Sequence, residues 1–82
     1  MKSIVPFKIT PNPSYDFITF ESPEDNPMQT IQIFDGIGQL VWSTSLQKKH
    51  QLTTNLNLNS GVYFVKIQFI QGFGNQKLVI QK

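Results

Sequence analysis

His50 is the single histidine of this 82-residue chain, and there is no cysteine to accompany it. A transition-metal site or a Ser-His-Asp triad needs further ligands or partners, and the sequence supplies neither a second imidazole nor a thiolate. His50 follows Lys48 and Lys49 at the start of an expected strand, which is typical of a solvated surface residue. We therefore expect no catalytic residues, no enzymatic activity and no cofactor.

Acidic side chains are few and scattered. They are Asp16, Glu21, Glu24, Asp25 and Asp35. Glu24 and Asp25 fall in a proline-bounded loop, where solvated charge is expected, and no spacing matches a calcium-binding loop. The sequence thus predicts no metal site, with a weak surface calcium site as the alternative.

The positive charge comes from seven lysines and no arginine, and the net charge is only +2. Guanidinium groups make the bidentate contacts to phosphate and guanine that nucleic-acid binding favours, so we do not expect a nucleic-acid partner. No apolar stretch reaches the length of about 18 residues that crosses a bilayer, which argues against direct membrane insertion. The first residues are also too short an apolar run for a signal peptide, so an export signal would lie elsewhere.

Exposed aromatic rings on β-sandwiches can stack on sugars, and four rings raise this idea. They are Tyr15, Trp42, Tyr63 and Phe73. In so small a domain the largest ring is needed for the core, so we interpret Trp42 as a core residue. A sugar-binding platform at Trp42 is the alternative interpretation.

Between turn signals, apolar and polar residues alternate with the period of half-buried strands, clearest from Tyr63 to Ile70. Turn residues recur about every 10 to 12 positions, and alanine, the best helix former, is absent. We predict one all-β domain over residues 1–82, an antiparallel β-sandwich, with residues 1–4 as the end of a linker to an upstream domain. The predicted strands are 5–9, 16–21, 29–35, 39–46, 50–58, 62–70 and 75–81.

Three turn motifs punctuate these strands. Pro11-Asn12-Pro13-Ser14 is a stiff, extended corner, because each proline fixes its own φ and restrains the preceding residue. Asp35-Gly36-Ile37-Gly38 predicts a hairpin turn capped by the Asp35 side chain, and it lacks the spacing of a phosphate-binding loop. Asn59-Ser60-Gly61-Val62-Tyr63 opens a strand, and the Tyr63 hydroxyl can hold a loop backbone.

Taken in order, these motifs resemble the type A C-terminal sorting domain of the type IX secretion system. The similarity covers about residues 7–82, including Ile31–Val41, Leu56–Ile67 and the closing segment Gln76–Lys82. It implies an immunoglobulin-like sandwich of about seven strands that catalyses nothing and ends a larger cargo protein. The cargo would cross the periplasm to an outer-membrane translocon and its shuttle protein. A surface sortase would then remove the domain, leaving the cargo at the cell surface or outside the cell.

The resemblance assigns the sorting signal by position. The matching residues are Pro11, Asn12, Pro13, Asp35, Gly38, Gly61, Tyr63, Lys77, Val79 and Lys82. Two positions depart from the family pattern: Gln39 stands where a basic residue is common, and Asn59 where proline is common.

A physical mechanism fits the last strand. At a sheet edge, its backbone groups and side chains would be open to a pairing partner. Lys77 and Lys82 would discourage indiscriminate pairing and offer charge to an acidic receptor. The alternative function is an immunoglobulin-like adhesion or carbohydrate-binding module of an extracellular protein.

Overall fold

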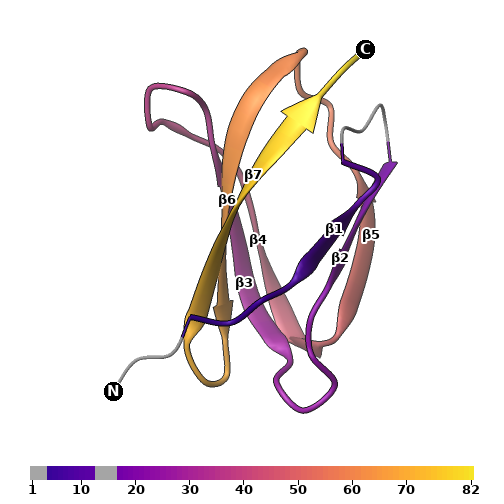
Figure 1. Ribbon diagram of the computed structural model, residues 1–82, viewed down its shortest axis with the longest axis vertical. Helices are drawn as coiled ribbons and strands as arrows, with labels where there is room; N and C mark the ends of the chain where they lie inside the picture. Colours follow the sequence, from indigo (N-terminus) through magenta and orange to yellow (C-terminus); the bar gives the residue numbers. More distant parts are fainter. Residues whose placement is uncertain (1–3, 13–16) are drawn as a thin grey trace.

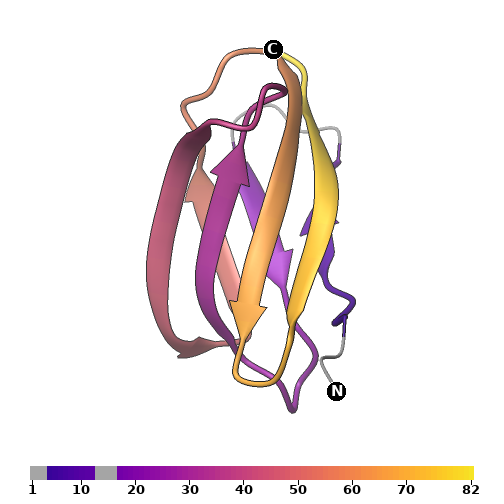
Figure 2. The same cartoon turned by 90° about the vertical axis from the view of Figure 1, so that its left-hand side faces the viewer.

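Two antiparallel sheets face each other in the computed structural model, which describes residues 4–12 and 17–82 (Figure 1). The smaller sheet has the order β1-β2-β5, and the larger has the order β4-β3-β6-β7, as Figure 2 shows face-on. The described residues contain strands and no helix, which confirms the predicted all-β sandwich. The strands are β1 (Lys8–Thr10), β2 (Phe17–Glu21), β3 (Met28–Phe34), β4 (Leu40–Lys49), β5 (Gln51–Asn55), β6 (Gly61–Phe69) and β7 (Phe73–Ile80).

The core lies between the two sheets and is built from the predicted alternating stripes. Ile31 and Ile33 of β3, and Val65 and Ile67 of β6, are all almost completely buried. The remaining buried apolar side chains come from the segment before β1, from the strands other than β4 and β5, and from the residue after β5: Val5, Phe7, Ile9, Ile18, Phe20, Met28, Leu56, Tyr63, Phe69, Leu78 and Ile80. Since these buried side chains come from both sheets and face one another, they form a single core between the sheets.

Trp42 belongs with this core, as the sequence predicted. It is half-buried, packs against the buried cluster and stacks on Phe20, with ring centroids 6.5 Å apart and an interplanar angle of 14°. A ring held against another ring on the inner side of its sheet does not form a sugar-stacking platform on the outer side.

The chain crosses from one sheet to the other between β4 and β5, and here the predicted boundaries were wrong. The strand expected to end at residue 46 continues to Lys49, through a register irregularity opposite Met28 to Thr30 and a φ of 54° at Lys48. The next strand ends at Asn55 rather than at residue 58, although Leu56 remains buried and Leu58 half-buried. Burial continues beyond the ladder, so alternation alone overestimates the strand.

The segment before β1 is also not the strand that the sequence predicted for residues 5–9. Residues 5–7 precede β1, yet Val5 and Phe7 are buried because the segment packs along the start of β7. The backbone N–H of Val5 donates to the carbonyl of Phe73 at 2.8 Å, and Ile4 forms a parallel bridge with the same residue. The first described residues are therefore tied to the last strand.

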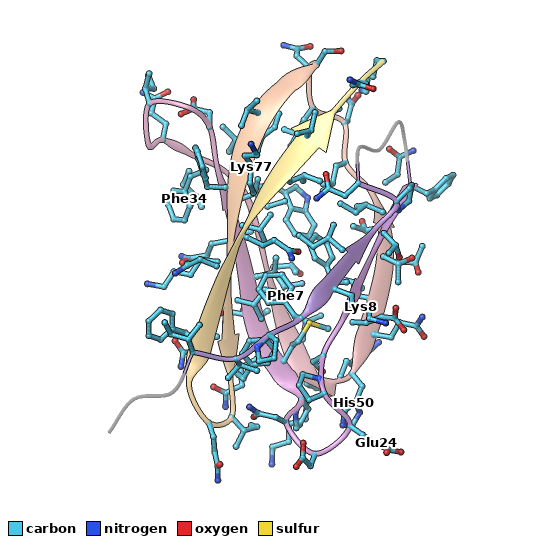
Figure 3. The ribbon with its side chains drawn as sticks, in the orientation of Figure 1. Phe7, Lys8, Glu24, Phe34, His50 and Lys77 are labelled. Carbon is cyan, nitrogen blue, oxygen red and sulfur yellow. The ribbon has the colours of Figure 1, made fainter. Side chains whose placement is uncertain are left out.

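Polar side chains fix the end of the sandwich where this segment enters. Asn26, in the loop between β2 and β3, donates to the carbonyl of Gln71 at 2.8 Å and accepts from its backbone N–H at 3.0 Å. Glu24 and His50 lie at the same end (Figure 3). Nothing in the described part of the chain is a helix of the length and apolar character needed to cross a membrane.

Candidate functional site

The described motif residues gather toward one end of the sandwich, opposite the end where residue 4 lies (Figure 1). This end contains Asn12, the turn 35–39, the connection 56–60 and the C-terminus, and we call it the C-terminal pole. The backbone N–H of Lys82 donates to Ser60 Oγ at 2.9 Å, which joins the tail to the connection before β6. Pro13 lies outside the described residues, as do the predicted strand start at Asp16 and the ring of Tyr15.

The terminal strand β7 lies at an edge of the four-stranded sheet, as the sequence predicted. One side of the strand belongs to the core, because Leu78 and Ile80 are 0% and 1% exposed. Lys77 is exposed and Val79 is half-buried on the opposite side. The same eight residues therefore stabilise the fold on one side and expose side chains on the other.

The outer edge of β7 is less open than the sequence suggested, because Asn12 covers part of it. Its side-chain amide donates to the carbonyl of Lys77 at 3.0 Å, and its amide oxygen accepts from the N–H of Val79 at 3.1 Å. A carboxamide has the same donor and acceptor as a peptide unit, so Asn12 pairs with β7 as a short strand would. At the other end of β7, the segment before β1 makes the corresponding contact at Phe73.

Tyr63 and Gly61 form the corner that opens β6. The Tyr63 ring is 8% exposed, and its hydroxyl donates to the carbonyl of Asn59 at 2.8 Å. This is the tyrosine corner of immunoglobulin-like sandwiches, in which a ring near a strand start ties back the preceding connection. Gly61 packs beside the ring, since a Cβ built there would lie 3.7 Å from Tyr63 Cε1. The predicted tie between the Tyr63 hydroxyl and a loop backbone is confirmed.

Asp35 caps the hairpin between β3 and β4, again as predicted. Its Oδ1 accepts from the backbone N–H groups of Ile37 at 3.0 Å and Gln39 at 2.9 Å. Gly38 takes the left-handed conformation, with a φ of 90°, which glycine adopts without a steric penalty. A carboxylate already occupies the N–H groups of this loop, so it is built as a turn and not as a phosphate cradle.

Gly74 is a structurally demanding residue that the sequence pattern does not single out. It is buried in β7, and a Cβ there would collide with the Val5 carbonyl oxygen and lie 2.9 Å from the Phe7 ring. The absent side chain lets the segment before β1 approach β7 closely. No local signal distinguishes this glycine from its neighbour Gly72, because the contact joins the two ends of the described chain.

Sequence reasoning also missed an apolar patch on the outer face of the four-stranded sheet at the C-terminal pole. Phe34 lies on this outer side, away from the smaller sheet (Figure 3). The patch consists of Phe34, Leu40, Val41, Val62, Phe64 and Val79. The available signal was at Val62 and Phe64, where β6 is apolar on the face opposite its buried stripe.

The structure offers little for catalysis or metal binding among its described residues. No group of three or more histidine, cysteine or acidic side chains comes together there to hold a metal ion. A shallow depression of ≈ 240 Å³ lies farther along the sheet and is lined by residues such as Thr30, Gln32, Ser43 and Lys66, with no aromatic ring. The features at the C-terminal pole are those of a shaped surface with a fixed backbone.

Comparison with known families matches residues 8–81 to the secretion system C-terminal sorting domain. The chain belongs to this family. The sorting domains in question serve type IX secretion, which exports cargo through the outer membrane to the cell surface or the extracellular space. The match spans β1 to β7 and therefore includes the whole sandwich. A search of curated proteins finds no match.

As a sorting domain, this chain works together with the type IX secretion system and an upstream cargo. The family is not one of enzymes. The polar groups of Asn12, Asp35 and Tyr63 form hydrogen bonds with backbone groups inside the domain. The groups left outward at the same end are Lys77, the Lys82 side chain and the apolar patch.

Proposed function

We propose that the type IX outer-membrane translocon recognises this domain in its folded form as a sorting signal. The C-terminal pole is the surface that is recognised. The translocon and its shuttle protein bind the pole after the cargo has entered the periplasm, and a surface sortase then removes the domain. The nine motif residues that the structure describes divide into those that shape the pole and those that contact the machinery. Lys77, Val79 and Lys82 belong to the second group.

The observation that supports this proposal is the convergence of motif residues on one pole within a domain whose family match covers residues 8–81. Asn12 reaches Lys77 and Val79 across 65 and 67 positions of the sequence. A linear tail read as an unfolded peptide would need none of these long-range contacts. A folded surface needs them, because they hold the terminal strand in place.

The direct test is secretion of a reporter that carries its own N-terminal export signal and ends in this domain. In a bacterium with a working type IX system the reporter should appear at the surface or in the medium. In the matched strain lacking the translocon it should stay in the periplasm. Equal release from both strains, or retention in both, would reject the proposal.

Deleting Gln76–Lys82 would be a poor version of this test, because the deletion also removes the buried Leu78 and Ile80. Loss of secretion could then reflect unfolding. A better variant pair is Lys77→Gln with Lys82→Gln, since both side chains are exposed and the tail contact to Ser60 uses the backbone of Lys82. Reduced secretion with unchanged thermal stability would support charge recognition by an acidic receptor.

A further inference from the structure

The apolar patch is contiguous across all four strands of the larger sheet. Phe34 of β3 lies opposite Leu40 of β4 on one side and opposite Phe64 of β6 on the other. Val62 lies opposite Val79 on the terminal strand. The register shifts between Ile33 and Phe34, so that Leu40 and Val41 of β4 both lie opposite Phe34.

These side chains are exposed to an extent that folding alone does not require. Leu40 is 51% exposed, Phe64 47% and Val62 45%. Single exposed apolar residues are ordinary, but a contiguous group marks a surface that contacts another molecule. Farther along the same face the outward residues turn polar, with Lys66 and Gln68 following Phe64 on β6. The patch at the C-terminal pole is thus bounded on β6 by two polar residues, although Ile4 and Ile70 are also exposed at the other end of the sandwich.

The chain that precedes the domain enters at the far end of the sandwich. Ile4 is bridged to Phe73 at the start of β7, whereas the patch lies at the end of that strand (Figure 1). A cargo domain joined before residue 4 is thus attached at the end of the sandwich opposite the patch. The patch is placed to meet a molecule other than its own cargo.

The charge around the patch indicates what kind of molecule this is. Lys77 lies directly opposite Phe64, and Lys82 closes the tail. Lys66 follows on the same face, but its Nζ lies 5.8 Å from the centroid of the Phe73 ring, toward the other end of β7. Asp35 is the acidic residue nearest this end among the described residues, and its carboxylate oxygen is held by two backbone N–H groups. Lysines around an apolar centre complement a partner with apolar side chains flanked by carboxylates.

We propose that the apolar patch, with its lysine border, is the docking site for a protein of the export machinery that presents aromatic or aliphatic side chains between acidic ones. This inference rests on the proposed function and names the surface and the partner chemistry that carry it. A second copy of the domain is disfavoured, because a two-fold contact through this patch would bring the same lysines of both copies together.

The test uses the same cargo–domain reporter, with three outward-facing substitutions on β6. Phe64→Thr and Val62→Thr remove apolar surface from the patch, while Gln68→Thr is the matched control outside it. Threonine suits a strand, so Phe64→Thr and Val62→Thr should stay folded, with the melting temperature lowered only by the loss of cross-strand contacts. Gln68→Thr loses an exposed hydrogen bond to the Gly72 carbonyl, so a loss of secretion caused by lower stability alone would appear in this variant as well. Truncating a central aromatic anchor in an interface typically costs tenfold or more in affinity, so Phe64→Thr should lower the secreted fraction about tenfold. Val62→Thr should lower it less, and Gln68→Thr should leave it unchanged.

Each outcome decides the inference. Normal secretion of Phe64→Thr and Val62→Thr would overturn it while leaving the proposed function intact, because the parent reporter would still depend on the translocon. An equal loss in Gln68→Thr would also overturn it, by showing that the effect is not confined to the patch. A parent domain that sediments as a dimer, and a Phe64→Thr variant that sediments as a monomer, would assign the patch to self-association instead. Failure of the parent reporter to depend on the translocon would instead reject the proposed function.

Discussion

Asn12→Ala removes the side chain that holds the outer edge of β7. The amide of Asn12 makes two hydrogen bonds to the terminal strand, one to the Lys77 carbonyl and one from the Val79 N–H. Alanine can replace neither. We therefore expect the variant to keep the sandwich and to lose the connection between the corner at Pro11 and the end of β7.

The magnitude follows from the two bonds and their exposure. A typical intramolecular hydrogen bond contributes about 0.5–1.5 kcal/mol net, and these two lie at the surface, where water can replace the lost partner. The free energy of unfolding should thus fall by about 1–2 kcal/mol in total. For a domain of this length each kcal/mol lowers the melting temperature by about 4–8 °C, so a decrease of about 4–16 °C is expected.

Urea unfolding of the purified domain, followed by tryptophan fluorescence, measures the loss. Asn75→Ala is the matched control. Asn75 is an exposed asparagine of β7, and its side chain makes no hydrogen bond within the described residues. The midpoint should fall for Asn12→Ala and stay close to the parent value for Asn75→Ala, with the slope unchanged in both.

Amide hydrogen exchange locates the effect. The N–H of Val79 should exchange faster in Asn12→Ala, because it loses its acceptor. The N–H of Leu78 should not change, since the alternation of the antiparallel ladder points it toward β6, where Leu78 pairs with Tyr63. Equal midpoints for the two variants, together with unchanged exchange at Val79, would refute the conclusion that Asn12 acts as a short pairing strand.

Three further substitutions test the contacts that shape the domain. Gly74→Ala should destabilise the domain by about 3 kcal/mol or more in urea unfolding, because the new methyl group would collide with backbone and ring atoms. Gly36→Ala is the control and should have little effect in the same assay, because there is open space around Gly36. Tyr63→Phe should lower the free energy of unfolding by about 1–2 kcal/mol by leaving the Asn59 carbonyl without its donor; an unchanged melting temperature would contradict the corner. Asp35→Ala should cost about 1–2 kcal/mol in urea unfolding, while Asp35→Asn, which keeps the acceptor oxygen, should cost clearly less.

The features that could be predicted from the sequence are those fixed by residues close together in the chain. Period-two alternation predicted seven strands, because the side chains of a strand point alternately to its two faces. The Asp35 cap and the Tyr63 corner were predictable for the same reason, since each joins groups only two to four residues apart.

Contacts between distant parts of the chain were not predictable in the same way. The partner of Asn12 is 65 residues away, and the clash that selects Gly74 comes from residues 5 and 7. The move of the chain from β4 to β5 in the other sheet also leaves no mark on the alternation, because both segments show the same half-buried pattern. Such features depend on which strands meet, and the pattern within one strand does not specify this.

At the C-terminal pole, different residues stabilise the fold and face outward, so their effects on stability and on recognition can be measured separately. Asn12, Asp35 and Tyr63 use their polar groups to hold backbone inside the domain, so replacing them should impair secretion only as far as it unfolds the pole. Phe64 and Lys77 face outward, and replacing them removes surface without removing core. Secretion plotted against the free energy of unfolding should therefore place the first group on one curve and the second group below it. A single curve for all variants would mean that the machinery senses only whether the sandwich is folded, and that its outward side chains carry no information.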